Sequence, residues 1–178
     1  MGGEKRVSLI RRLLDTEIPV MGHLGLTPQS VHRFGGYRVQ GRIAGDAEQI
    51  IRDALALDRA GVFAIVLEGI PSELAALITS EVSAPTLGIG AGPGCDGQVL
   101  VLNDILSLNF KKPAKFVRIY ADGTSLIRDA VRRFRADVES HSYPSDAECY
   151  HLPRGLRASL DEILRRAKAG PSPTSGRN

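Results

Sequence analysis

A glutamate that closes an apolar run is the first candidate for chemistry in this sequence. Glu68 follows Val62–Leu67, six apolar residues with no polar interruption. Such continuity predicts a strand covered on both faces, as in a parallel sheet, and parallel α/β folds carry their reactive groups at the carboxyl ends of the strands. Glu68 is therefore a candidate base for removing a proton beside a carbonyl. The alternative is a glutamate that ends the strand and caps a helix beginning near Pro71.

His23 is a second candidate, because it lies just beyond another short apolar run, Ile18–Met21. At the rim of the same sheet, its imidazole could donate a hydrogen bond to a carboxylate or to a metal-bound water. A structural histidine beside glycines is the alternative. The remaining histidines lack the i, i+4 spacing of a local metal site, so no ligand role is assigned to His32, His141 or His151.

Glycine is concentrated in Gly88–Gly97, and Gly92–Gly97 matches the pattern G-x-G-x-x-G. The match does not indicate a dinucleotide site, because Pro93 interrupts the helix that should open there and no acidic residue ends a strand about twenty residues on. A tight turn that brings backbone close to the site is the favoured interpretation, with Asp96 as a turn former rather than a ligand. Cys95 is disfavoured as a nucleophile because no neighbouring base can be named.

Helical and extended patterns alternate along the chain around these residues. Apolar residues at helical spacing predict helices over 7–14, 47–60, 71–82, 124–138 and 156–169. Short apolar runs predict strands over 18–21, 62–67, 85–90 and 115–120. This alternation predicts the α/β class with about four parallel strands, each wholly apolar. The irregular segment 22–42 is too long for an idle connection and is expected to be a functional loop.

The helix expected after Gly123 is amphipathic, and Thr124 or Ser125 is expected to cap it. Its apolar face is made of Leu126, Ile127, Ala130, Val131, Phe134 and Val138. The net charge of +3 comes from scattered residues such as Arg11-Arg12, Arg132-Arg133 and Arg165-Arg166, which lie in helical patterns beside acids. With no tryptophan and only 5% aromatic residues, this pattern favours solvated helix faces over a nucleic-acid surface.

The composition fits one globular domain, since 178 residues with 43% hydrophobic content can build a core. Cys95 and Cys149 lack C-x-x-C spacing, so neither a disulfide framework nor a zinc site is indicated, and a reducing cytoplasm fits. No apolar stretch approaches the roughly 18 residues of a membrane span, and no membrane partner is expected.

Several longer motifs resemble one enzyme family, ketopantoate hydroxymethyltransferase, and they occur in its order. They are the segments 20–30, 34–42, 65–75, 88–92 and 95–101, followed by weaker likeness at 115–117 and 143–150. The likeness extends to about Pro153, and Ser107 stands where the family usually has glycine. The resemblance implies the C-terminal half of a (β/α)8 barrel, with the first three to four βα units missing.

The resemblance implies transfer of a one-carbon unit from 5,10-methylenetetrahydrofolate to a small keto acid, 3-methyl-2-oxobutanoate, giving 2-dehydropantoate. By the same resemblance, Mg²⁺ would hold the keto acid, Glu68 matches the proton acceptor and His23 matches a histidine near the substrate or a metal-bound water. The family's two aspartate ligands of Mg²⁺, its substrate lysine and a third acidic residue have no counterpart after Met1. An isolated chain is therefore expected to have little or no activity.

Three interpretations of the early start at Met1-Gly2-Gly3 are open. The first is an incompletely translated or wrongly started version of an ordinary enzyme. The second is a half-barrel subunit that needs a partner carrying the N-terminal half, and the third is a noncatalytic remnant. The resemblance also implies a homo-oligomer of barrels. By residues, 1–153 are expected to form the partial barrel, 154–170 a C-terminal helix and 171–178 a flexible tail.

Overall fold

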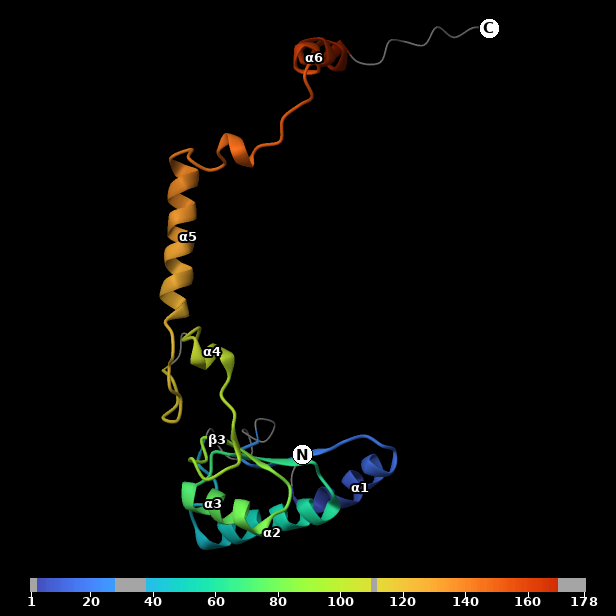
Figure 1. Cartoon of the computed structure of the whole chain (residues 1–178), viewed down its shortest axis with the longest axis vertical. Coiled ribbons are helices and arrows are strands. Elements are labelled where there is room, and N and C mark those ends of the chain that lie inside the picture. Colours follow the sequence, from blue (N-terminus) through green and yellow to red (C-terminus); the bar gives the residue numbers. More distant parts are fainter. Residues whose placement is uncertain (1–2, 28–37, 110–111, 170–178) are drawn as a thin grey trace, which may run out of the picture. The chain divides into compact units, whose positions relative to one another are not determined.

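The computed structural model describes residues 3–27, 38–109 and 112–169, and it divides into two units. The first unit, residues 1–126, contains a parallel sheet of four strands (Figure 1). Its strands are β1 (Met21–Gly25), β2 (Ala64–Glu68), β3 (Thr86–Ile89) and β4 (Gly97–Gln98), and they are hydrogen-bonded in that order. Every neighbouring pair is parallel. The predicted α/β class with about four parallel strands is confirmed.

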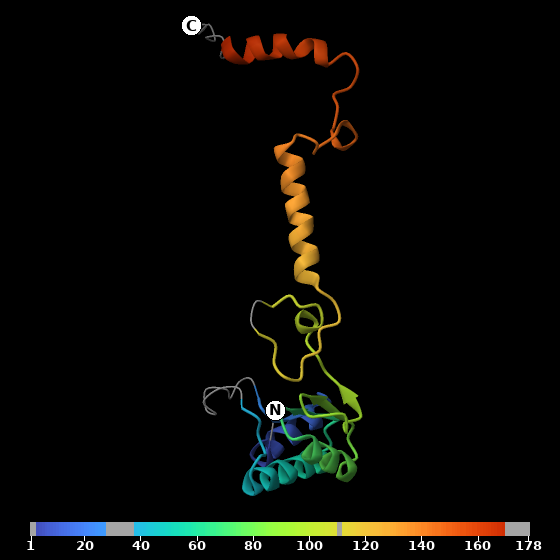
Figure 2. The ribbon, with the colours of Figure 1, turned by 90° about the vertical axis from the view of Figure 1, so that its left-hand side faces the viewer.

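Three helices cover one face of this sheet: α1 (Val7–Asp15), α2 (Ala44–Ala60) and α3 (Ser72–Glu81) (Figure 2). Apolar side chains from the helices and the sheet meet there, and the largest fully buried ones are Ile10, Leu57, Ile65, Leu67 and Ile78. Burial of each such side chain contributes about 1.5–3 kcal/mol, so this layer is the main source of stability.

The opposite face of the sheet is less covered. On this face Val66 of β2 pairs with Leu87 of β3, and Glu68 pairs with Ile89. All four side chains are only partly buried. One-sided cover explains why the strands contain polar residues. The expectation of wholly apolar strands was wrong, because β1 includes His23 and β2 ends in Glu68.

The predicted strand over 115–120 was wrong. The backbone N–H groups of Tyr120 and Ala121 donate to the carbonyl oxygen of Ile105, at 2.9 and 3.3 Å, instead of to a neighbouring strand. Ile105 ends α4 (Leu102–Ile105), a short helix that no sequence pattern indicated. The fourth strand is β4, whose two residues pair with Leu87 and Gly88 of β3.

The first strand lies later in the chain than expected. It spans Met21–Gly25 rather than 18–21, so His23 lies inside β1 and not beyond its end. The predicted loop over 22–42 therefore begins after Gly25 instead of at Gly22. Its residues 28–37, which include His32, lie outside the described residues. The predicted helices over 47–60 and 71–82 are confirmed as α2 and α3, with α2 beginning three residues earlier.

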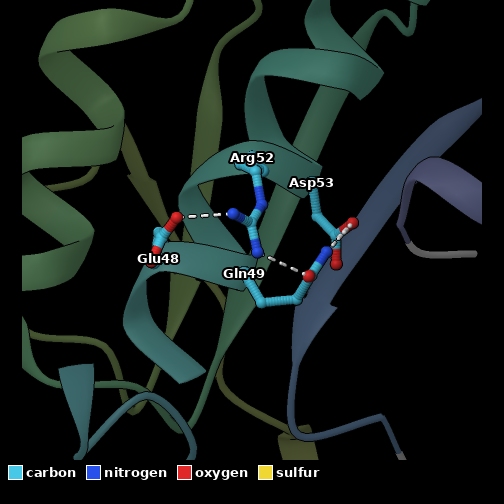
Figure 3. Close-up of polar contacts among 4 residues, drawn as sticks. All are labelled: Glu48, Gln49, Arg52 and Asp53. Carbon is cyan, nitrogen blue, oxygen red and sulfur yellow. Dashed lines mark hydrogen bonds and ion pairs between the residues drawn. The ribbon is translucent and has the colours of Figure 1, made fainter. Parts of the chain in front are cut away.

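Polar side chains of α2 bond to one another (Figure 3), and Asp53 among them holds the turn Glu4–Arg6. One carboxylate oxygen of Asp53 accepts the backbone N–H of Glu4 at 2.8 Å and the side-chain amide of Gln49 at 3.0 Å. Arg52 in turn donates to the Gln49 side-chain oxygen at 3.0 Å and pairs with Glu48. Asp53 thereby fixes the short 3-10 turn Glu4–Arg6 that leads into α1.

The second unit, 127–178, contains most of α5 (Gly123–Glu139) and all of α6 (Leu160–Ala169). Two short 3-10 turns lie between them, Asp146–Glu148 and Arg157–Ser159. Both predicted helices are confirmed, although α6 begins after one of these turns. The Phe134 ring packs edge-on against Tyr143, with 5.4 Å between ring centroids.

The apolar side of α5 is solvent-exposed, with Leu126 at 68% and Val131 at 60% of full exposure. Its arginines follow the expected pattern of solvated faces, since Arg132 pairs with Asp129 at 3.5 Å. The expected caps were wrong. The carboxylate of Asp122 accepts the Ser125 backbone N–H at 3.0 Å and so caps the helix. Within the described ranges, no helix is both long and apolar enough to span a bilayer.

Ser107 has a backbone conformation that favours glycine. Its φ is 53°, in the left-handed region, just after α4. Ser107→Gly is therefore expected to stabilise the protein by roughly 0.5–1 kcal/mol, because relief of the steric cost exceeds the added chain entropy. Urea unfolding measures the change. Ser80→Gly, inside α3, is the control and should destabilise by a similar amount. A lower midpoint for Ser107→Gly would contradict the prediction.

Candidate active site at the ends of the first two strands

The side chains of His23 and Glu68 meet on the less covered face of the sheet. Nε2 of His23 lies 2.9 Å from Oε2 of Glu68. The parallel register explains the contact: His23 pairs with Val66 and Gly25 pairs with Glu68, so the two side chains project from the same face one step apart. Glu68 is the last residue of β2, at the carboxyl end of the strand as predicted.

Both side chains are partly accessible, with 24% of His23 and 15% of Glu68 exposed. A substrate could reach them, yet neither is freely solvated. The interpretation of Glu68 as a helix cap was wrong, because α3 begins at Ser72 with no side-chain hydrogen bond at its N-terminus. In the described part of the chain, the Glu68 carboxylate is instead bonded to His23.

Apolar side chains adjoin this pair. Val66 and Leu87 occupy the register row of His23, and Ile89 pairs with Glu68. The backbone around Glu68 is tightly held, since its carbonyl oxygen accepts the Leu26 N–H at 2.8 Å. A carboxylate on a firm backbone beside apolar residues can take a proton from a carbon acid and contact its alkyl part.

Cys95 lies on the other face of the sheet from this pair. Its sulfur would be 3.0 Å from a Cβ added to Gly88, and Gly88 belongs to the helix-covered rows together with Leu67. Cys95 packs against the core cluster.

Asp96 holds the glycine-rich segment to the beginning of β3. Its Oδ2 accepts the backbone N–H of Thr86 at 2.7 Å and the Thr86 hydroxyl at 3.1 Å. Thr86 is fully buried and also bonds the hydroxyl of Thr79 on α3 at 2.8 Å. Asp96 is thus a structural residue, in keeping with its predicted role in a turn. The sequence carried no signal for Thr86, because a buried threonine has the same pattern as an apolar strand residue.

Comparison with known sequences places these residues in a family. A sequence profile described as "Ketopantoate hydroxymethyltransferase" matches residues 1–146, which include His23, Glu68 and the glycine-rich segment. The chain belongs to the ketopantoate hydroxymethyltransferase family. The resemblance inferred from its motifs is confirmed.

Individual members of the ketopantoate hydroxymethyltransferase family align with this chain over only part of their own length. A Koribacter versatilis protein is 64% identical over 168 residues, covering 94% of this chain and 57% of that protein. A Pelobacter propionicus protein is 56% identical and a Syntrophomonas wolfei protein 52%, each matched over 55% of its length. All three are named 3-methyl-2-oxobutanoate hydroxymethyltransferase. The chain spans about half the length of these relatives, and its parallel sheet is consistent with part of a (β/α)8 barrel.

Asp96 gives this member of the ketopantoate hydroxymethyltransferase family a stability that depends on pH. The Thr86 backbone N–H, and then the Thr86 hydroxyl, hold the pKa of the Asp96 carboxyl below its usual value. A lowered pKa means that the ionised carboxylate stabilises the fold above about pH 4, and that this stabilisation is lost as pH falls through the folded-state value.

Asp96→Asn is therefore expected to lower the urea midpoint at pH 7 and to lose the part of the wild-type decline toward pH 3 that Asp96 causes. Urea unfolding followed by circular dichroism at the two pH values measures both effects. Asp15→Asn, an exposed carboxylate at the end of α1, is the matched control and should behave as wild type. Equal midpoints for Asp96→Asn and wild type at pH 7 would show that these hydrogen bonds do not stabilise the fold.

Proposed function

We propose that this chain acts in the reaction of 3-methyl-2-oxobutanoate hydroxymethyltransferase, in the cytoplasm, with Glu68 as the proton acceptor. The keto acid would receive a hydroxymethyl group from 5,10-methylenetetrahydrofolate and become 2-dehydropantoate. The observation that supports this most directly is the His23–Glu68 pair, in which Glu68 closes β2 and His23 lies two residues before the end of β1, in a chain of this family.

Proton removal is the step that these residues can perform. Glu68 would take the proton from carbon 3 of the keto acid, and the electron pair of the broken C–H bond would move toward the neighbouring carbonyl. The resulting enolate carbon would then form the new bond to the one-carbon unit, whose bonds to the folate nitrogens break to release tetrahydrofolate, with water supplying the hydroxyl oxygen. Val66, Leu87 and Ile89 would contact the branched alkyl part of the substrate, because they adjoin the carboxylate on the same face.

Mg²⁺, which the family resemblance implies, does not fit the described residues. Mg²⁺ prefers octahedral oxygen coordination through carboxylates, waters and substrate oxygens. In the parts of the chain that the structure describes, no three His, Cys, Asp or Glu side chains gather into a possible metal site. One oxygen of Glu68 is also engaged by His23. No step proposed for these residues passes through the metal.

A half-barrel subunit or a noncatalytic remnant is the second candidate. It is favoured by the partial exposure of the face that carries His23 and Glu68. A partner carrying the remainder of a barrel, or another copy in a homo-oligomer, would complete the site.

Growth of a pantothenate-requiring bacterium that lacks its own enzyme of this family distinguishes these functions. The chain is expressed alone, and also together with the part of the Koribacter versatilis protein that it does not match. Growth without pantothenate in the first case supports an autonomous enzyme, and growth in the second case alone supports a subunit. No growth in either case, with soluble chain present, would contradict the proposal and support a remnant.

A further inference from the structure

We infer that His23 is a positioning residue for Glu68: its Nε2–H donates to Oε2, which leaves Oε1 as the oxygen that takes the substrate proton. This inference rests on the proposed function, because it assigns roles to atoms within the same site. Its starting point is the 2.9 Å separation of Nε2 and Oε2, an ordinary hydrogen-bond length.

The tautomer follows from the chemistry of the partner. An ionised carboxylate has acceptor atoms only, so a neutral imidazole facing it must carry its proton on the nitrogen that faces it. For His23 that nitrogen is Nε2. Nδ1 is then the unprotonated nitrogen.

The strand register determines the side from which the imidazole approaches the carboxylate. His23 and Glu68 are one step apart on neighbouring strands, so the imidazole approaches the carboxylate from the β1 side. Ile89 of β3 pairs with Glu68 on its other side. The hydrogen bond fixes the rotation of the carboxylate between these two strands, and the 15% exposure of Glu68 leaves access for a substrate.

The proton transfer to Glu68 accounts for each bond, proton and electron pair. When Oε1 takes the proton from carbon 3, the C–H bond breaks, an O–H bond forms and the substrate keeps the electron pair as an enolate. Glu68 becomes a neutral carboxylic acid that still accepts the His23 hydrogen bond at Oε2. No proton passes to His23, so its replacement should affect the orientation of the base and not the binding of substrate.

The first test measures the tautomer and requires no activity. Long-range ¹H–¹⁵N NMR spectra of the histidine-labelled chain, recorded where the rings are neutral and assigned with His23→Gln, should show His23 protonated at Nε2. Glu68→Leu should remove this preference, while His151, exposed on the second unit, serves as an internal control. A His23 protonated at Nδ1, or one unchanged in Glu68→Leu, would overturn the inference and leave the proposed function intact.

The second test measures deuterium exchange at carbon 3 of the keto acid in the form that supports growth. His23→Leu is expected to lower kcat for exchange about tenfold or more with KM unchanged, as loss of a partly buried hydrogen bond predicts. His23→Gln should restore most of the rate, because its amide nitrogen can replace Nε2–H. A raised KM with unchanged kcat, or no rescue by glutamine, would overturn the inference. Absence of exchange in wild type would count against the proposed function.

Discussion

Glu68→Gln is expected to slow deuterium exchange at carbon 3 of 3-methyl-2-oxobutanoate by at least about a hundredfold, as removal of a general base does. Glutamine has nearly the shape of glutamate, and its side-chain oxygen can still accept from His23 in place of Oε2. The fold and the hydrogen bond should therefore persist while the basic oxygen is lost. Proton NMR of the keto acid in deuterated buffer gives the rate, measured on the form that supports growth.

A matched variant separates this effect from general damage. Glu73→Gln makes the same chemical change on α3, five residues later, at an exposed position. Its exchange rate should equal that of wild type, and both variants should unfold at similar urea concentrations. If Glu68→Gln exchanged as fast as wild type, another group would be the base and the proposed role of Glu68 would be lost.

Gly25→Ala is expected to destabilise the protein by about 3 kcal/mol or more, which is a large part of the 5–15 kcal/mol typical of a domain. Gly25 ends β1 with φ of 84°, and a Cβ there would lie 2.2 Å from the Glu68 carbonyl oxygen and 2.7 Å from the Ile70 side chain. Since that oxygen accepts the Leu26 N–H, β1 and β2 would have to separate at the site.

Gly45→Ala is the control for this prediction. Gly45 lies in the first turn of α2, and apart from the adjacent residues and backbone of α2 no atom lies within 4 Å of an added Cβ. Alanine has the higher helix propensity, so this variant should be neutral or stabilised by up to about 1 kcal/mol. Urea unfolding measures both variants. A Gly25→Ala protein as stable as wild type would show that the ends of β1 and β2 can move apart without cost.

The segment from α2 to β3 could be predicted from sequence because its local signals agree. An apolar stripe defines α2, Gly61 ends it in a left-handed conformation, and the apolar run that follows contains β2. The segment 115–120 has a similar apolar pattern but no strand, since its backbone bonds to the end of α4 instead. Pairing depends on which strand edge lies nearby, and the local pattern does not contain that information.

The site was predicted in part for the same reason. The sequence indicated that Glu68 closes a strand, and this is correct. It did not indicate that His23 lies within β1, because the glycines around it are typical of a loop. The contact between the two side chains depends on the register of β1 against β2, and register is a property of the assembled sheet.

The left-handed glycines at the strand ends affect how a mutational survey of this protein should be interpreted. Gly25 and Gly90, at the ends of β1 and β3, would each bring an added Cβ within 2.7 Å of a neighbouring atom. Substitutions there would lower cellular activity by reducing the amount of folded protein. A survey that scores growth alone would therefore assign catalytic importance to positions that act through folding, and measuring protein abundance in the same cells would separate the two causes.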